Sequence, residues 1–184
     1  AYNRTRRIFS DVFRKMDLLN CDGIVVCFHR LQENRGNPEK LRKQFVEELK
    51  SMCSSRYMVY LQHHPYKQLS CGGWQSTGKA IEELKSIIDE VDCPNIKIAL
   101  DLGHISPTSE CPEKLAGDLN DKLGIVLLSS CTTDAYGQSY DSHSPAVCGW
   151  QNLSWLKAAG VPVIFDANYM NLAEEYTDLK LLND

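Results

Sequence analysis

The sequence lacks the features of several large classes of protein. No apolar run approaches the roughly 20 residues that a membrane-spanning helix needs, so we expect no membrane association. The chain begins at Ala1 without an initiator Met or the apolar segment of a signal peptide, which we interpret as a cut-down chain or a fragment. The G-x-G-x-x-G loop of nucleotide-binding sheets is missing, since Gly72-Gly73 lacks the required spacing.

The chain also lacks the net positive charge of a general polyanion binder. The 184 residues carry a formal net charge of −4, and the sequence pI is near 5.7. Any phosphate recognition would therefore have to be local, through a few cationic groups or bound metal ions. Hydrophobic residues make up 43% of the chain and charged residues 24%, which is ordinary for a globular protein.

The chain has eight cysteines, but no two of them form a C-x-x-C motif. They are Cys21, Cys27, Cys53, Cys71, Cys93, Cys111, Cys131 and Cys148. The even count permits a disulfide framework, but chains of this size seldom need one. We expect reduced thiols and an intracellular protein, with zinc–thiolate sites as the weaker alternative because no C-x-x-C pair exists.

What is present is one alternating pattern of short apolar runs and helical stripes. The runs predict strands at residues 24–28, 57–61, 96–100, 125–128 and 163–165. Helical spacing surrounds them at residues 8–19, 41–52, 81–91, 115–123, 153–159 and 172–182. Continuous apolar strands alternating with helices indicate an α/β protein with a parallel sheet covered by helices. Residues 1–184 are expected to form a single domain, and both a doubly wound sheet and part of an eight-stranded (β/α) barrel fit.

Histidines and aspartates follow the predicted strands. All five histidines lie at or just beyond strand ends: His29, His63, His64, His104 and His143. Asp101 and Asp166 each end a strand, and Asp141 stands beside His143. The carboxyl ends of parallel strands open on one face, so these side chains should converge there.

Two short motifs make metal binding the favoured chemistry at that face. Asp101-Leu102-Gly103-His104 and Asp141-Ser142-His143 each place a carboxylate and an imidazole within a few residues. A cation needs such groups from several segments aimed at one point. Either motif alone is common by chance, but the two together with His29 predict a metal site.

The same residues resemble a known family. The stretches that carry the likeness are Val25–His29, Tyr60–His64 with Ile98–His104, and Tyr140–Pro145 followed by Val163–Asp166. They are similar to endonuclease IV, a zinc-dependent apurinic/apyrimidinic (AP) endonuclease of the xylose isomerase-like TIM barrel superfamily. The resemblance implies an incomplete TIM-type barrel of about five βα units, corresponding to barrel strands four to eight.

The resemblance also implies a set of zinc ligands. His104, Asp141 and His143 match the three protein ligands of one zinc. His29 matches a histidine of a second zinc, and Asp101 a carboxylate of the third. Asp166 stands at the position of the family's last glutamate. The cofactor implied is zinc, as one ion or as up to three.

Two departures weaken that centre. The family's bridging glutamate falls at Gln62, and a neutral amide holds two cations together poorly. His63 is a doubtful substitute because the next position along a strand points its side chain elsewhere. The histidine of a later strand has no counterpart, with Leu127, Ser129 and Ser130 in that region.

Three functions follow from the resemblance. We favour a degenerate, non-catalytic descendant that keeps one zinc site and acts as a structural or nucleic-acid-associated subunit. The first alternative is a zinc-dependent AP endonuclease or phosphodiesterase in DNA repair, acting on DNA with abasic sites. The second is a sugar isomerase or epimerase of the same superfamily. An incomplete barrel leaves open sheet edges, so we also expect another chain or segment to cover them.

Overall fold

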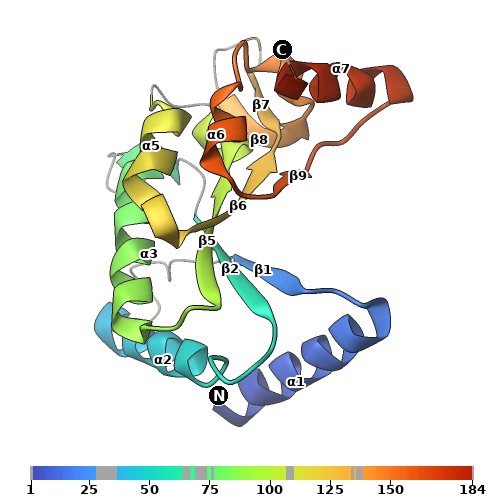
Figure 1. Cartoon of the computed structure of the whole chain (residues 1–184). Coiled ribbons are helices and arrows are strands. Elements are labelled where there is room, and N and C mark those ends of the chain that lie inside the picture. Colours follow the sequence, from blue (N-terminus) through green and yellow to red (C-terminus); the bar gives the residue numbers. More distant parts are fainter. Residues whose placement is uncertain are drawn as a thin grey trace.

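A five-stranded parallel sheet forms the centre of the molecule. The computed structural model describes residues 2–27, 37–63, 67–68, 74–75, 77–106, 110–133, 135 and 139–183. The strands are β1 (Gly23–Cys27), β2 (Met58–Gln62), β5 (Ile96–Asp101), β6 (Leu123–Leu128) and β9 (Val163–Phe165). They lie in the order β1-β2-β5-β6-β9, and each neighbouring pair is parallel. The curved sheet is a half-barrel, which confirms the predicted incomplete (β/α) barrel (Figure 1).

Helices connect successive strands. They are α1 (Tyr2–Leu19), α2 (Pro38–Lys50), α3 (Thr77–Val91), α4 (Leu102–Ile105), α5 (Pro112–Leu119), α6 (Trp155–Ala159) and α7 (Leu172–Asn183), with 3₁₀ turns η1 (Asn120–Lys122) and η2 (Ala146–Cys148). Local chemistry sets their ends: the Asn37 side chain accepts hydrogen bonds from the backbone amides of Glu39 and Lys40, and Pro38 opens α2. No helix in the described part of the chain is long and apolar enough to cross a membrane.

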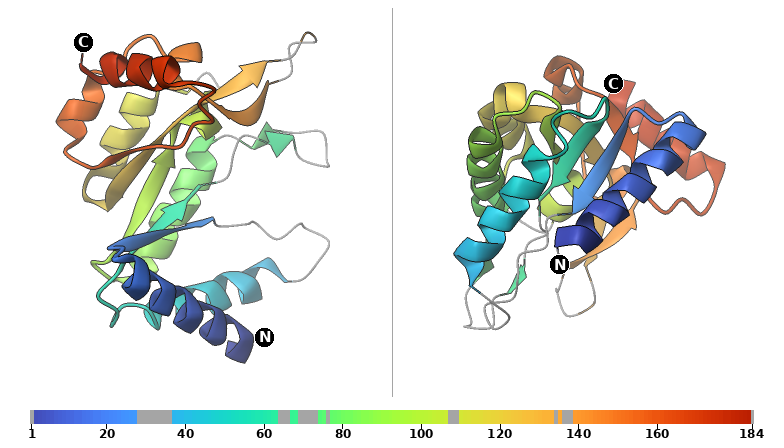
Figure 2. Two further views of the ribbon diagram at one scale, coloured as in Figure 1. Left: turned by 90° about the vertical axis from the view of Figure 1, so that its right-hand side faces the viewer. Right: turned by 90° about the horizontal axis from the view of Figure 1, so that it is seen from below.

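The main core lies between the outer face of the sheet and the helices. Alternate strand residues such as Leu61, Ile98 and Val126 are fully buried there against Leu84 of α3. Figure 2 shows these helices wrapped along one side of the curved sheet. Burying each large apolar side chain stabilises the fold by about 1.5–3 kcal/mol. This layer accounts for the alternate apolar residues of each strand that face outward.

The inner face of the sheet carries a smaller cluster around Tyr60. Ala99, Ile125 and Leu127 are buried beside it. The Tyr60 ring lies against Gly124, where an added Cβ would come within 2.7 Å of the ring and 2.5 Å of the Lys97 Cβ. Burial raises the pKa of the Tyr60 phenol. The Tyr60 ring can therefore lie across β5 on the inner face of the sheet because β6, two strands away, has glycine at position 124.

Two antiparallel pairs supplement the parallel sheet. They are β3 (Lys67–Gln68) with β4 (Trp74–Gln75), and β7 (Ser130–Thr133) with β8 (Ser139–Ser144). The sequence predicts a polar loop where β7 and β8 form a hairpin. The prediction was wrong there because the sequence of the two strands has no alternation of apolar residues. Hydroxyl groups of Thr132, Ser142 and Ser144 lie within 2.6–2.9 Å of one another across the pair.

The expectation that all thiols are reduced was also wrong. Cys53 and Cys93 form a disulfide with a Cα–Cα distance of 5.7 Å. The two residues are 40 apart in the sequence, so no close spacing marked them as a pair. They stand at corresponding positions of successive repeats, each shortly after a helix and before the next strand, and the packing of α2 on α3 brings them together.

Candidate metal centre

The predicted site residues lie where strands of the half-barrel end. Gln62 is the last residue of β2, Asp101 the last of β5, and Asp166 directly follows β9. The backbone amide of Asp166 donates to the carbonyl of Leu128 at 3.0 Å, which ties the end of β9 to the end of β6. The parallel sheet therefore places these polar positions at one end of the barrel, as the sequence predicts.

Asp101 is the most enclosed of these residues. Its side chain is fully buried and caps the one-turn helix α4, because Oδ1 accepts a hydrogen bond from the backbone amide of His104 at 3.3 Å. The side-chain amide of Gln62 donates to the other oxygen, Oδ2, at 2.5 Å. Protein groups thus hold both oxygens of this carboxylate.

The ring of His104 has a defined tautomer. Nδ1 lies 2.8 Å from the backbone carbonyl of His63, which accepts only, so Nδ1 carries a proton. Nε2 lies 3.4 Å from Asp101 Oδ2. A neutral ring would aim its Nε2 lone pair toward a carboxylate oxygen. A proton or a cation at this point relieves that opposition.

His63 has a structural role in the same cluster. Its side chain is fully buried, and Nε2 accepts a hydrogen bond from the backbone amide of Asp101 at 3.0 Å. The ring is edge-on to His104 with centroids 5.4 Å apart. Since Nε2 is occupied as an acceptor, the proton of this neutral imidazole is on Nδ1. His63 orders the end of β5, and the sequence offered no signal for that role beyond its place after Gln62.

His143 and Asp166 form a second pair. Nδ1 of His143 lies 3.0 Å from the Asp166 carbonyl and 3.4 Å from its Oδ2. The backbone of His143 is left-handed with φ of 48°, which is uncommon outside glycine, and its carbonyl accepts from the Asn168 amide at 2.6 Å. Contacts of the ring and of the backbone carbonyl therefore hold His143 in this uncommon conformation.

The two pairs come from adjoining elements, because α4, which carries His104, contacts β8, which carries His143. His29 lies outside the described residues, and only the backbone of Asp141 is described, in β8. Among the residues that are described, no group of three or more His, Cys, Asp or Glu side chains is arranged to hold a metal ion.

Ser129 stands where the later histidine would be expected. It follows β6, is fully buried, and its hydroxyl has no hydrogen-bond partner. Its backbone carbonyl accepts from the Trp150 indole at 2.9 Å. The sequence places Ser129 at this strand end but gives no sign that its hydroxyl is unsatisfied.

Comparisons with known proteins define the fold. No family model matches the chain, and no curated protein does. Among solved structures, a family 2 AP endonuclease from Brucella melitensis superposes with a TM-score of 0.66 at 16% identity, covering 94% of this chain and 65% of that one. A xylose isomerase domain protein from Alicyclobacillus acidocaldarius gives a TM-score of 0.67 at 16% identity, covering 99% and 71%.

A third solved structure adds a metal to the comparison. A xylose isomerase-like TIM barrel protein from Mycobacterium smegmatis, in complex with magnesium, gives a TM-score of 0.61 at 15% identity and covers 97% of this chain and 68% of that one. This chain thus spans about two thirds of the length of these proteins. The likeness shows that the chain has the fold of xylose isomerase-like TIM barrel proteins, as an incomplete barrel.

The donor set suits a metal ion such as zinc in part. His104 and His143 each direct Nδ1 to a backbone carbonyl, which is the outer contact that metal-binding histidines usually make. Each neutral ring then has its lone pair on Nε2, the nitrogen that would bind the ion. Asp101 fits less well, because the Gln62 amide places hydrogens against its Oδ2.

Proposed function

We propose that this chain is a non-catalytic relative of the AP endonucleases that keeps one metal site. His104, Asp141 and His143 would hold a single zinc ion, whose role would be to tie α4 to the β7–β8 hairpin. The protein would act as a structural or nucleic-acid-associated subunit, and a further chain or segment would cover the open edges at β1 and β9.

The observation that carries this proposal is the hydrogen bond from Gln62 to Asp101. In a multinuclear centre, a carboxylate at position 62 would share its negative charge between cations. Here the position holds an amide that donates to Asp101 at 2.5 Å. Protein groups therefore satisfy both oxygens of Asp101. In this proposal the hydrogen bond takes the place of the metal ions that Gln62 and Asp101 would otherwise bind.

The two Nδ1 contacts support retention of the other half. Orienting a histidine through a backbone carbonyl fixes its tautomer and aims Nε2. His104 is 4% exposed, so it is held in one orientation by its surroundings. Zinc binding would add stability to the folded state by mass action.

The test is metal content measured by mass spectrometry on purified protein, paired with His143→Asn. Asparagine tolerates the left-handed backbone at this position, so the variant removes the imidazole with little added strain. The matched control is Asp92→Asn, because Asp92 is also left-handed, with φ of 51°, and lies just before β5 at the other end of the strands.

We expect about one zinc per chain in the parent and in Asp92→Asn, and loss of that zinc in His143→Asn. Metal-free parent protein would contradict the site. Cleavage of DNA containing an abasic site by the zinc-loaded chain would contradict the non-catalytic role and favour the AP endonuclease alternative. Turnover of a sugar would favour the isomerase or epimerase alternative.

A further inference from the structure

The amino ends of the strands, opposite the candidate metal centre, carry a pair of neighbouring cysteines. Cys53 lies between α2 and β2, and Cys93 lies between α3 and β5. The segments are aligned by the parallel pairing of β2 with β5, in which the Val59 amide donates to the Asn95 carbonyl at 2.8 Å. The Cα–Cα distance of 5.7 Å falls within the range that a disulfide bridges without backbone movement.

We propose that Cys53 and Cys93 form a reversible redox pair that exchanges with a low-molecular-weight thiol and its disulfide. The pair would link or release the segments that follow α2 and α3, at the amino ends of the strands. This proposal is independent of the proposed function, because the cysteines lie at the opposite ends of the strands from Gln62, Asp101 and Asp166.

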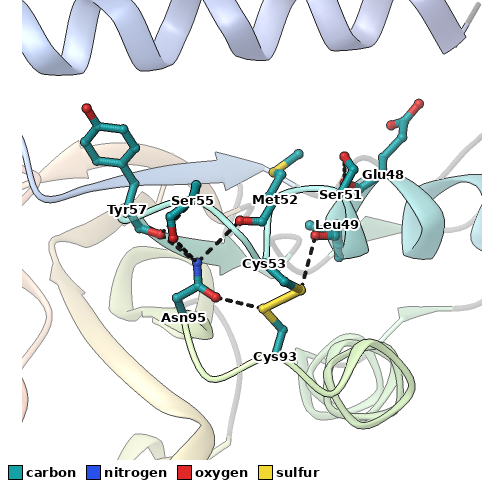
Figure 3. The surroundings of a disulfide bond; sticks show 9 residues. All are labelled: Glu48, Leu49, Ser51, Met52, Cys53, Ser55, Tyr57, Cys93 and Asn95. Atoms are coloured by element: carbon teal, nitrogen blue, oxygen red, sulfur yellow. Dashed lines mark hydrogen bonds between the residues drawn. A yellow bond between two sulfur atoms is a disulfide. The ribbon is translucent and has the colours of Figure 1, made fainter.

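The polar surroundings of the two sulfurs suit the reduced state (Figure 3). The Cys93 sulfur lies 2.7 Å from the side-chain oxygen of Asn95, and the Cys53 sulfur lies 3.7 Å from the backbone carbonyl of Leu49. A thiol can donate a hydrogen bond, whereas a disulfide sulfur cannot. Reduction therefore creates two S–H groups that each have a hydrogen-bond acceptor nearby.

Asn95 holds this region together without the sulfur–sulfur bond. Its side-chain nitrogen lies within hydrogen-bonding distance of three carbonyls in the turn that carries Cys53: 3.5 Å from Met52, 3.2 Å from Ser55 and 3.0 Å from Tyr57. Figure 3 shows these contacts fanning out from one amide. The turn thus stays fixed beside Cys93 after reduction, which keeps the two thiols positioned to reoxidise.

The difference in exposure sets the order of exchange. Cys93 is 7% exposed, whereas Cys53 is half-buried and more accessible. The Cys53 thiolate attacks the small disulfide, forms a mixed disulfide and releases one thiol. Cys93 then loses its proton to solvent, attacks the Cys53 sulfur and displaces the second thiol. In sum, two protein thiols and one small disulfide give one protein disulfide and two small thiols.

The experiment equilibrates the whole chain in buffers of reduced and oxidised glutathione. Samples are quenched in acid, alkylated, digested without reduction and mapped by mass spectrometry. We expect the Cys53 and Cys93 peptides to become linked together, in one transition, with loss of two hydrogens. The internal controls are the exposed Cys21, Cys111 and Cys148, which should each take up one glutathione instead.

A second variant tests the order of attack. In Cys93→Ser, the Cys53 mixed disulfide has no thiol to resolve it, so the glutathione adduct should accumulate on Cys53. Independent glutathione adducts on both cysteines of the parent would overturn the pair. So would loss of the folded far-UV circular dichroism signal on reduction at 25 °C, because the bond would then be a permanent staple. Unlinked, alkylated cysteines throughout the oxidised range would overturn it as well.

Discussion

The side-chain amide of Gln62 donates a hydrogen bond to Oδ2 of Asp101 at 2.5 Å, across the ends of two neighbouring parallel strands. Asp101 also caps α4 and faces His104, so a single fully buried carboxylate links β2, β5 and α4. Replacing the amide with a second carboxylate would turn an attractive contact into a repulsive one.

Gln62→Glu tests that contact. Without metal, we expect the variant to lose about 1–3 kcal/mol of unfolding free energy at pH 7, because a donor is replaced by a like charge beside a buried carboxylate. Added zinc should raise the melting temperature of the variant more than that of the parent, since a cation offsets the repulsion. The measurement is thermal unfolding in a chelator and then in zinc.

The matched control for that variant is Gln44→Glu, the same change at an exposed position of α2. Its stability should stay within about 0.5 kcal/mol of the parent. If Gln62→Glu in chelator behaves like the control, the hydrogen bond between Gln62 and Asp101 does not contribute, and the argument for a replaced centre fails.

Asp178 anchors the C-terminal helix, and its removal should be costly. The fully buried carboxylate accepts from the backbone amides of Ala146 at 2.7 Å and Val147 at 2.8 Å, and from the Tyr169 hydroxyl at 2.8 Å. We expect Asp178→Ala to lose on the order of 3 kcal/mol, because three donors lose a charged acceptor. Urea unfolding measures this loss, with exposed Asp118→Ala as the control.

Tyr169→Phe separates one of those contacts from the others. The variant keeps the aromatic ring and both backbone bonds to Asp178, so it should lose only about 1 kcal/mol. Burial and the neighbouring Asp178 carboxylate raise the pKa of Tyr169 well above its usual range. An equal loss in Tyr169→Phe and Asp178→Ala would show that the backbone contacts contribute nothing.

The sequence predicted the frame of the molecule because the frame depends on local periodicity. Runs such as residues 96–100 and 125–128 are apolar and bounded by helical stripes, and both became central strands. The topology of a parallel array then placed Asp101 and Asp166 at one end. Those inferences need only the pattern along the chain and the rule that strand ends share a face.

Contacts between distant segments could not be predicted in this way. The disulfide joins positions one repeat apart, and Asp178 reaches back to the turn at Ala146 and Val147. The β7–β8 hairpin has no apolar alternation, so nothing distinguished it from a loop. The tautomers of His63 and His104 depend on which atoms face their ring nitrogens in the folded chain, and the pattern along the sequence does not contain that information.

A pH-dependent contact fastens α1 to the start of β2. The Tyr57 hydroxyl and Arg56 guanidinium both donate to Oδ1 of Asp17, and these contacts, the Tyr57 hydrogen bond foremost, lower the pKa of Asp17. A lowered folded-state pKa stabilises the fold above the unfolded value of about 3.9. That stability is lost as the pH falls through the folded value.

Asp17→Asn should therefore be less stable than the parent at pH 7 and should approach it at pH 3. Urea unfolding at the two pH values measures the gap between the two proteins. Asp11→Asn, an exposed change on the same helix, is the control and should show a smaller gap at pH 7. A gap for Asp17→Asn that stays constant down to pH 3 would mean that ionisation of Asp17 does not support the contact.

Two glycines should respond in opposite directions to the same substitution. Gly117 lies inside α5, and an added Cβ would have nothing within 4 Å. Gly117→Ala should therefore stabilise the protein by about 0.5–1 kcal/mol, through helix propensity and a less flexible unfolded chain.

At Gly124 the added Cβ would meet the Lys97 Cβ at 2.5 Å and the Tyr60 ring at 2.7 Å. Gly124→Ala should therefore cost about 1–3 kcal/mol as an overpacked core does. Urea midpoints of the two variants, compared with the parent, decide both signs. A neutral Gly124→Ala would show that Tyr60 is free to leave the inner face, and the inside of the half-barrel would then not be filled by this ring.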